Sequence, residues 1–271
     1  MKTYDVTALG ELLIDFTENG ISGQGNPVLE ANPGGAPCNV LAMLTKLGHK
    51  TAFIGKVGED FFGEQLKDAI TEVGIDADGL CIDKEIHTTL AMVHTYPDGD
   101  RDFSFYRNPG ADMMLNKEEI CEDIIKETKI FHFGTLSMTH EEVREATKEA
   151  IRIAEESGAV ISFDPNLRPP LWNSLDEAKE QVLYGLKHCH ILKISDNEIQ
   201  WLTGEEDYTA GVNWIRERYQ IPLILVSMGK EGSRAYYNGM MVEVKPFLQK
   251  KNYVKPALIA DSTKFLFFNF L

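Results

Sequence analysis

The sequence predicts an α/β fold: a mainly parallel sheet with helices on both faces, and a small β-sheet that stands apart from it. Short apolar runs typical of buried strands alternate with longer stretches whose apolar residues recur at helical spacing. This alternation is typical of parallel sheets covered by helices. Residues 11–33 and 86–107 interrupt it, because both are β-like and the second contains the turn Pro97-Asp98-Gly99-Asp100. A hairpin does not fit a strand–helix–strand crossover, so these residues predict a separate sheet.

The expected elements follow in chain order. The strand-like runs are residues 6–9, 51–54, 129–133, 159–163, 191–194 and 223–227. Helical spacing is found around residues 37–47, 61–73, 140–157, 175–187, 196–203 and 209–219. Three helices begin with residues typical of a capping box, namely Thr139 with Glu142, Ser174 with Glu177 and Ser195 with Glu198. No repeat or Pro/Ser-rich linker divides the chain, so we expect residues 1–271 to form a single domain.

Composition narrows the class of protein. The net charge of −15 disfavours nucleic acid and anionic membranes as partners. The four cysteines form no C-x-x-C pair, which argues against a zinc site or a disulfide framework. In His188-Cys189-His190, adjacent residues of a strand would point to opposite faces, which argues against a metal site. The sequence shows neither a signal-peptide pattern nor an apolar run that could span a bilayer, so we expect a cytoplasmic protein.

The most informative stretch is Gly34-Gly35-Ala36-Pro37-Cys38-Asn39, which opens a helical pattern that ends at Gly48. Adjacent glycines allow positive φ and a close approach of a ligand to the backbone. Pro37 suits the first position of a helix. The start of such a helix presents free N–H groups to a polar ligand, and Asn39 adds a donor and an acceptor. The alternative is a tight strand-to-helix turn that binds no ligand.

Other polar residues follow predicted strands, where α/β enzymes keep their sites. Asp15 lies in an apolar stretch, and its carboxylate can accept hydrogen bonds from two vicinal hydroxyls; alternatively it faces solvent on an edge strand. Asp164-Pro165-Asn166-Leu167-Arg168 directly follows a strand, and Arg168 suits phosphate or hydroxyl recognition. Ser227-Met228-Gly229-Lys230-Glu231-Gly232 follows another strand. Simple turns and a helix cap are the alternative explanation for these loops.

The order of these motifs resembles the ribokinase-like (PfkB) family of carbohydrate kinases, and within it the fructokinases most closely. The resemblance covers roughly residues 4–247, and its most specific parts are the signature at 34–39 and the segments 53–58 and 60–63. Residues 102–109, 163–168 and 192–195 are also similar to fructokinases. The resemblance implies a ribokinase-like fold and phosphoryl transfer from ATP, with Mg²⁺, to a sugar hydroxyl. It also implies that residues 11–33 and 86–107 form a lid, which in many members makes a homodimer contact.

The resemblance assigns roles residue by residue. It implies a sugar-binding set of Asp15, Gly34, Gly35, Asn39, Tyr106, Arg107 and Arg168. It implies a nucleotide-binding set of Asp164, Asn166, Lys193, Ser195, Ser227, Gly229 and Gly232. Glu198 matches the N-x-x-E element that the family keeps near Mg²⁺, with Ser195 in place of the asparagine.

The family pattern fails at its chemical centre. After Phe247 the family has D-T-x-G-A-G-D, whose last Asp is the base and whose glycine turn forms the anion hole. This chain reads Ala257-Leu258-Ile259-Ala260-Asp261, so Asp261 is the candidate base but no glycine precedes it. The change indicates a shifted reading frame, a sequence error or a real divergence near residue 250. We therefore expect residues 248–271 to be an atypical tail, without the helices that wall the adenine pocket in the family.

Two classes of function fit the sequence. The first is an ATP-dependent sugar kinase that acts on a small-molecule sugar, best matched by fructokinase, with weak or no turnover in this exact chain. The alternatives are a non-catalytic sugar-binding protein derived from the kinase fold, or a kinase for another sugar such as 2-keto-3-deoxygluconate or ribose.

Overall fold

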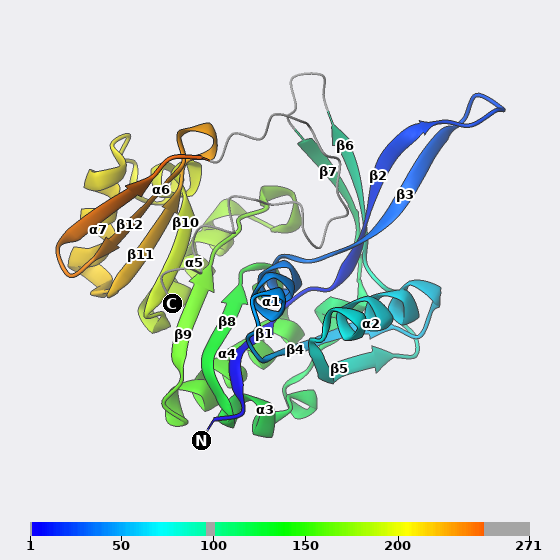
Figure 1. Ribbon diagram of the computed structural model, residues 1–271, viewed down its shortest axis with the longest axis horizontal. Helices are drawn as coiled ribbons and strands as arrows, with labels where there is room; N and C mark the ends of the chain where they lie inside the picture. The colour runs from blue at the N-terminus through cyan, green and yellow to red at the C-terminus, as the bar shows by residue number, and fades with distance from the viewer. Residues whose placement is uncertain (1, 96–100, 247–271) are drawn as a thin grey trace.

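The computed structural model describes residues 2–95 and 101–246, and these form a large, mainly parallel sheet and a smaller sheet (Figure 1). The large sheet has the strand order β13-β12-β11-β10-β9-β8-β1-β4-β5. Neighbouring strands from β5 to β11 are parallel, and β12 and β13 extend the sheet antiparallel to β11. The bounds are β1 (Tyr4–Leu9), β4 (Thr51–Gly58), β5 (Asp76–Asp83), β8 (Thr128–Gly134), β9 (Val160–Asp164), β10 (Ile191–Ser195), β11 (Leu223–Ser227), β12 (Ser233–Tyr237) and β13 (Met240–Val244).

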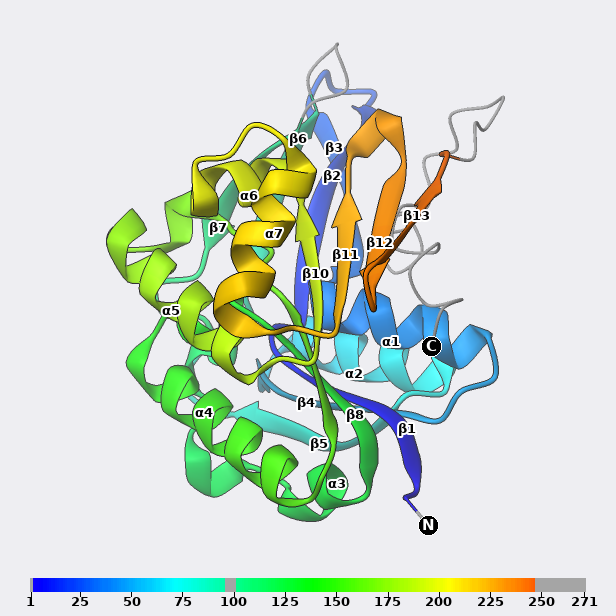
Figure 2. The ribbon, with the colours of Figure 1, turned by 90° about the vertical axis from the view of Figure 1, so that its left-hand side faces the viewer.

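Helices cover both faces of the large sheet because its strands bury alternate residues on opposite sides. On β1, Ala8 packs with the helices α1 (Ala36–Lys46) and α2 (Phe61–Val73), whereas Leu9 packs with the opposite group. That opposite group is α3 (Glu122–Lys126), α4 (Glu141–Glu156), α5 (Leu175–His188), α6 (Asp196–Thr203) and α7 (Tyr208–Tyr219). Figure 2 shows the longer helices of this group on one side of the sheet and α1 and α2 on the other.

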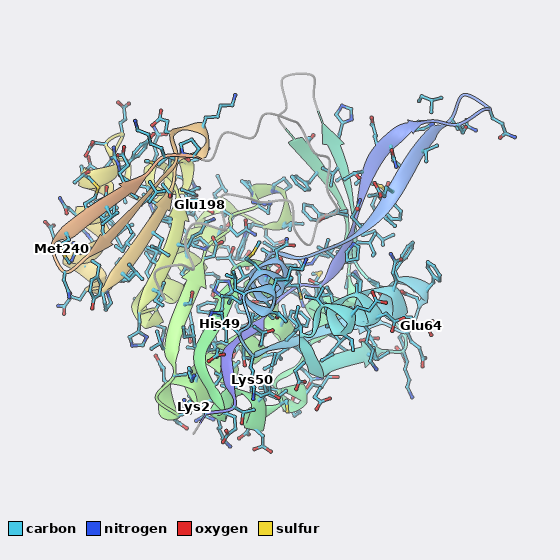
Figure 3. All side chains as sticks on the ribbon, viewed as in Figure 1. Lys2, His49, Lys50, Glu64, Glu198 and Met240 are labelled. Carbon is cyan, nitrogen blue, oxygen red and sulfur yellow. The ribbon has the colours of Figure 1, made fainter. Side chains whose placement is uncertain are left out.

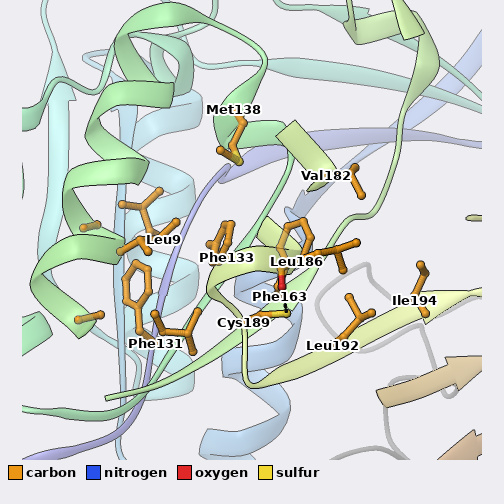
Figure 4. Packing of buried hydrophobic residues seen from close by; sticks show 14 of the residues in the cluster. Leu9, Phe131, Phe133, Met138, Phe163, Val182, Leu186, Cys189, Leu192 and Ile194 are labelled. Atoms are coloured by element: carbon orange, nitrogen blue, oxygen red, sulfur yellow. Dashed lines mark hydrogen bonds between the residues drawn. The ribbon is translucent and has the colours of Figure 1, made fainter. Parts of the chain in front are cut away.

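The larger core lies beneath α4 and α5 (Figure 4). Phe133 of β8 stacks on Phe163 of β9 with ring centroids 4.7 Å apart, and Leu186 of α5 lies beside them. These side chains are fully buried, so each contributes about 1.5–3 kcal/mol of hydrophobic free energy. The packing fixes the strands whose ends carry the polar loops described below.

The smaller sheet has the order β3-β2-β6-β7 and projects from one end of the large sheet (Figure 1). Its strands are β2 (Leu13–Ile21), β3 (Pro27–Gly34), β6 (Leu90–Thr95) and β7 (Arg101–Tyr106). β2 and β6 pair in parallel, which joins two segments that are distant in sequence. The prediction of a separate β-sheet from residues 11–33 and 86–107 is therefore confirmed; the turn at 97–100 lies outside the described residues. We call this sheet the lid.

The six expected strands and six expected helices are all present. The sequence did not predict β5, α3, β12 or β13. Three of these, β5, β12 and β13, are strands at or next to the edges of the large sheet. Strands there are less buried than central ones, so their sequences lack the continuous apolar run by which a strand is recognised. In the part of the chain that the structure describes, no helix is both long and apolar enough to cross a bilayer.

The three predicted capping boxes have different outcomes. Ser195 and Glu198 form both reciprocal hydrogen bonds of a capping box at the start of α6, as expected. Ser174 caps α5 through the N–H of Glu177, but the Glu177 carboxylate pairs with Arg144 instead of returning to the cap. The prediction for Thr139 is wrong: α4 begins after His140, and the Thr139 hydroxyl accepts a hydrogen bond from Arg107.

Candidate functional site

Three of the polar loops predicted from the sequence meet along the carboxyl ends of the parallel strands. Asp164 is aligned with Gly134 of β8, and Ser195 of β10 is aligned with Ser227 of β11. Lys193 lies 3.1–3.2 Å from both carboxylate oxygens of the buried Asp164. A cation and a buried carboxylate at this edge, flanked by two serines, form what we call the phosphate half of the site.

Glu198 is held within this half by protein groups (Figure 3). Its Oε2 accepts hydrogen bonds from the Ser195 backbone N–H and hydroxyl, each at 2.8 Å, and its Oε1 accepts one from the Leu167 N–H at 2.7 Å. Both carboxylate oxygens are therefore engaged in hydrogen bonds. Among the described residues no group of three His, Cys, Asp or Glu side chains could hold a metal ion. A role for Glu198 near Mg²⁺ stays a prediction.

The loop after β9 is fixed on both sides of its left-handed residue. Asn166 has φ +45°, a conformation that asparagine tolerates better than most residues. Before it, the Pro165 carbonyl accepts hydrogen bonds from the N–H and hydroxyl of Thr135; after it, the Leu167 N–H donates to Glu198. Arg168 then reaches the lid, where its guanidinium lies 5.6 Å from the centre of the Phe103 ring.

The turn after β11 contains the two glycines of the predicted nucleotide set. Gly229 and Gly232 both have positive φ, at +50° and +103°. The Met228 N–H donates to the Gly232 carbonyl at 2.9 Å, which closes the turn next to Ser227. Their contact with a nucleotide stays a prediction, but the structure places the turn at the same sheet edge as Ser195.

The inner face of the lid carries Asp15. Paired residues across a sheet share a face, so the register places Asp15, Asn32, Ala91 and Phe105 in one row. Asp15 lies over Gly34: a Cβ atom there would be 2.3 Å from its Oδ2, so only glycine leaves room for this carboxylate. Phe103 belongs to the same face, which is therefore the face directed at Arg168.

The start of α1 differs from the sequence-based interpretation. Gly35 has φ +118°, and a side chain there would collide with the Glu11 carbonyl, so Gly35 serves backbone packing. The Ala36 N–H is not free for a ligand, because it donates to Glu11 Oε1 at 2.7 Å. Burial raises the pKa of Glu11 to about 7. The buried Oδ1 of Asn39 has no hydrogen-bond partner among the described residues, so this oxygen can accept a hydrogen bond from a ligand.

Glu11 is a functional candidate that sequence reasoning missed. It stands between Gly10 and the apolar run Leu12-Leu13-Ile14, where a carboxylate needs a partner. That signal was available in the sequence, but the partner, the N–H of Ala36, was not.

Two members of the predicted sugar set have surroundings that the sequence did not predict. Arg107 is buried in an ion pair with Asp112 at 2.7 Å, and it also donates to Thr139 and the Leu136 carbonyl. Thr89 completes this group through a hydrogen bond to Asp112. Tyr106 is in register with Leu90 and Ile14, so it lies on the lid face opposite Asp15, and it is 64% exposed. The structure therefore does not bring Tyr106 to the other sugar residues, and Arg107 is engaged at the base of the lid.

The His188-Cys189-His190 cluster was interpreted as part of a strand, and this is wrong. His188 is the last residue of α5, and β10 begins only at Ile191. His188 pairs with Glu155 at 2.7 Å, and the His190 ring accepts a hydrogen bond from the Ile161 N–H. Both side chains thus have partners within the fold.

Comparison with known proteins decides the family. Residues 4–257 match the model for the pfkB family carbohydrate kinases. The chain belongs to this family. It is 42% identical to fructokinase-2 of Solanum lycopersicum over 85% of this chain and 71% of that protein.

Solved structures agree with this assignment. The pfkB chain matches the Xylella fastidiosa fructokinase with bound ATP at TM-score 0.81 and 31% identity, covering 91% of this chain and 75% of that one. It also matches an Escherichia coli structure in complex with ATP and Mg²⁺ at TM-score 0.82 and 26% identity, covering 92% and 80%. The predicted ribokinase-like fold and family are confirmed.

The predicted base of this kinase lies outside the described residues. Asp261 and most of the predicted tail at 248–271 also lie beyond residue 257, where the family match ends. The role of Asp261 therefore stays a prediction from the sequence.

Proposed function

We propose that the chain is an ATP-dependent kinase that recognises fructose and is built to transfer the γ-phosphoryl group of ATP to one of its hydroxyls. The observation that carries the proposal is the separation of two chemically different halves beneath one lid. Asp15 over Gly34 and the unpartnered Oδ1 of Asn39 form what we call the sugar half. Lys193 and Arg168 belong to the sheet edge opposite. The relatives named fructokinase supply the identity of the sugar.

The sugar half suits a neutral ligand that is rich in hydroxyls. A carboxylate such as Asp15 accepts hydrogen bonds from two vicinal hydroxyls, and Asn39 offers one more acceptor. The N-terminus of α1, which would otherwise attract an anion, already accommodates the Glu11 carboxylate. A phosphate placed there would be repelled by the acidic side chains of Glu11 and Asp15, whereas a neutral sugar would not be repelled.

The phosphate half suits the polyphosphate of ATP. Lys193 and Arg168 bring positive charge to this edge, and the turn at Gly229–Glu231 follows β11, the strand next to the one that carries Lys193. Mg²⁺ usually keeps several waters and is held mainly by substrate phosphates, so it needs few protein ligands. Asp164 and Glu198 fit such a site through water, because their oxygens are already engaged. When bound, MgATP would supply the phosphoryl group and offset its charge.

A homodimer formed through the lid belongs to the same proposal, as does a cytoplasmic location. The β2–β3 end of the lid supports the dimer, because Ile21, Val28 and Leu29 are exposed there at 68%, 39% and 44%. Apolar side chains gathered at a sheet end are typical of a contact surface.

Titration calorimetry of the purified chain tests the proposal. We expect fructose to bind, and ribose and 2-keto-3-deoxygluconate to bind at least about tenfold more weakly, since a site built for one set of hydroxyls leaves polar groups unpaired with another. Equal or tighter binding of either competitor would identify that sugar, and not fructose, as the substrate. Fructose binding without binding of MgATP would instead support a non-catalytic sugar-binding protein.

A further inference from the structure

The loop after β9 is anchored from two directions, and the residues it presents both belong to the candidate site. On one side Thr135, which is fully buried, bonds the Pro165 carbonyl with its hydroxyl at 2.5 Å. On the other side Glu198 accepts the Leu167 N–H at 2.7 Å. Asn166 stands between these anchors with φ +45°, and Arg168 follows them. The loop is thus held in one conformation by two side chains that do not themselves reach the lid.

Glu198 has used both of its carboxylate oxygens for this arrangement. One oxygen bonds the loop, and the other bonds the Ser195 N–H and hydroxyl at the start of α6. Hydrogen bonds to a charged group contribute about 1.5–3 kcal/mol each, more than neutral ones. The carboxylate therefore ties the loop after β9 to the end of β10, beyond the last register pair of these two strands, Phe163 with Leu192.

From the loop, the contacts continue to the lid. The Arg168 guanidinium lies over the ring of Phe103, which shares the inner lid face with Asp15. Phe103 in turn stacks on Phe105, with centroids 6.0 Å apart. A continuous series of contacts therefore leads from the phosphate half, through the loop, to the face that carries the sugar carboxylate.

We infer that Glu198 is a positioning residue: it holds the loop after β9 so that Asn166 and Arg168 stand at the site and Arg168 meets the lid. The expected effect on fructose binding rests on the proposed sugar-kinase function, whereas the claim that Glu198 holds the loop after β9 does not. It differs from a metal role, because it requires Glu198 for sugar binding even when neither Mg²⁺ nor nucleotide is present.

The first test measures hydrogen–deuterium exchange of the peptide that covers residues 164–172. Glu198→Met keeps the length of the side chain and removes both acceptor oxygens. We expect the Leu167 amide to exchange at least about tenfold faster in this variant, as loss of a hydrogen bond to a charged group implies. Glu177→Met is the matched control, because Glu177 occupies the same position near the start of α5 but pairs with Arg144 and Asn173, whereas the Leu167 N–H is bound by Glu198. Unchanged exchange in Glu198→Met would overturn the inference.

The second test measures fructose affinity by calorimetry without Mg²⁺ or nucleotide. We expect Glu198→Met to raise the Kd roughly tenfold and the Glu177→Met control to leave it unchanged. Thr135→Val removes the opposite anchor without touching Glu198 and should raise the Kd in the same direction, whereas Thr135→Ser should not. Thr135→Val keeps the anchoring of the loop testable if Glu198→Met does not fold.

The outcomes separate the inference from the proposed function. Wild-type fructose affinity in Glu198→Met, together with a higher Mg²⁺ requirement for ATP binding, would make Glu198 a metal-site residue and overturn the positioning role. Failure of the wild-type chain to bind fructose would contradict the proposed function instead. In that case the exchange of the Leu167 amide still decides whether Glu198 holds the loop.

Discussion

The two halves of the site are built in different ways. The phosphate half consists of strand ends that follow one another along the chain, and each loop is short and leads directly from a buried strand. The sugar half lies on β2, β3 and the start of α1, and its lid face is completed by β6 and β7, which pair with β2 from a distant part of the chain. Buried polar contacts join them, such as Glu11 with Ala36 and Arg107 with Asp112. Local sequence therefore determines one half, and tertiary contacts determine the other.

The halves also differ in charge. Near the start of α1 lie the carboxyls of Glu11 and Asp15, whereas Lys193 and Arg168 bring cations to the strand ends beside Asp164 and Glu198. A neutral sugar and an anionic phosphate thus each find a suitable environment, and the electrostatic difference keeps their binding sites distinct.

The largest expected effect concerns the residues before Asp261, the base predicted from the sequence. Loss of one donor from an anion hole costs roughly a hundredfold in rate, and Leu258 and Ala260 carry side chains where the family has bare glycine backbone. We expect turnover of MgATP and fructose to be at least about a hundredfold below the ~1 per second of ordinary kinases. The triple change Leu258→Gly, Ile259→Ala and Ala260→Gly, which restores G-A-G before Asp261, should raise it in a coupled ADP assay.

Fructose affinity is the control for this experiment, since the triple change replaces none of the residues that form the sugar half. Turnover near one per second in the unmodified chain would contradict the prediction. It would also support Asp261 as a catalytic base that does not need the glycines before it.

The next effect tests the electrostatics of the sugar half through pH. The pKa of Glu11 rises from 4.5 to about 7 on folding, because burial penalises the charged form. Between these values the folded chain binds a proton that the unfolded chain has released, so this group's contribution to stability falls as pH rises. The loss amounts to about 3 kcal/mol by pH 8. Glu11→Gln keeps an acceptor for the Ala36 N–H but cannot ionise.

Urea unfolding of both proteins from pH 5 to pH 8 measures this difference. We expect the free energy of unfolding of Glu11→Gln, relative to the parent chain, to increase steadily across that range. A difference that does not change with pH would show that Glu11 stays ionised in the folded chain.

Asp15→Ala should weaken fructose binding by about 2–3 kcal/mol, the range for hydrogen bonds to a charged group. Asp15→Asn retains one acceptor oxygen and should lose less. Calorimetry gives both values, and circular dichroism verifies that the variants are folded. Unchanged affinity in a folded Asp15→Ala protein would exclude Asp15 from the sugar site.

The smallest effect concerns the contact that joins the two halves. Phe103→Leu removes the ring beneath Arg168 but keeps an apolar side chain, so we expect fructose affinity to fall by about 0.5–1 kcal/mol, the usual size of a partly exposed cation–π contact. Phe103→Tyr keeps the ring and is the control. If the leucine and tyrosine variants bind fructose equally well, the contact plays no part in closing the lid over the sugar.

The same contrast between the halves explains how much could be predicted from the sequence. The strands before Asp164, Ser195 and Ser227 were found because each is an apolar run followed by turn residues, and such signals are local. Alternation with helices then placed all three at one sheet edge. The burial of Arg107 was not predicted, because its partners Asp112 and Thr139 meet it only after the lid has packed on the main sheet. The face on which Tyr106 lies depends on strand register, which a single sequence does not give.

The parallel pairing of β2 with β6 has a consequence for the order in which the chain folds. These strands lie on either side of β4, α2 and β5 in the sequence, so the lid cannot close its sheet until that part of the large sheet has brought them together. Contacts between distant segments form late, since the loop entropy must be offset first. A folding chain should therefore acquire the phosphate half before the sugar half. Amide protons of the lid should accordingly become protected after those of β8, β9 and β10.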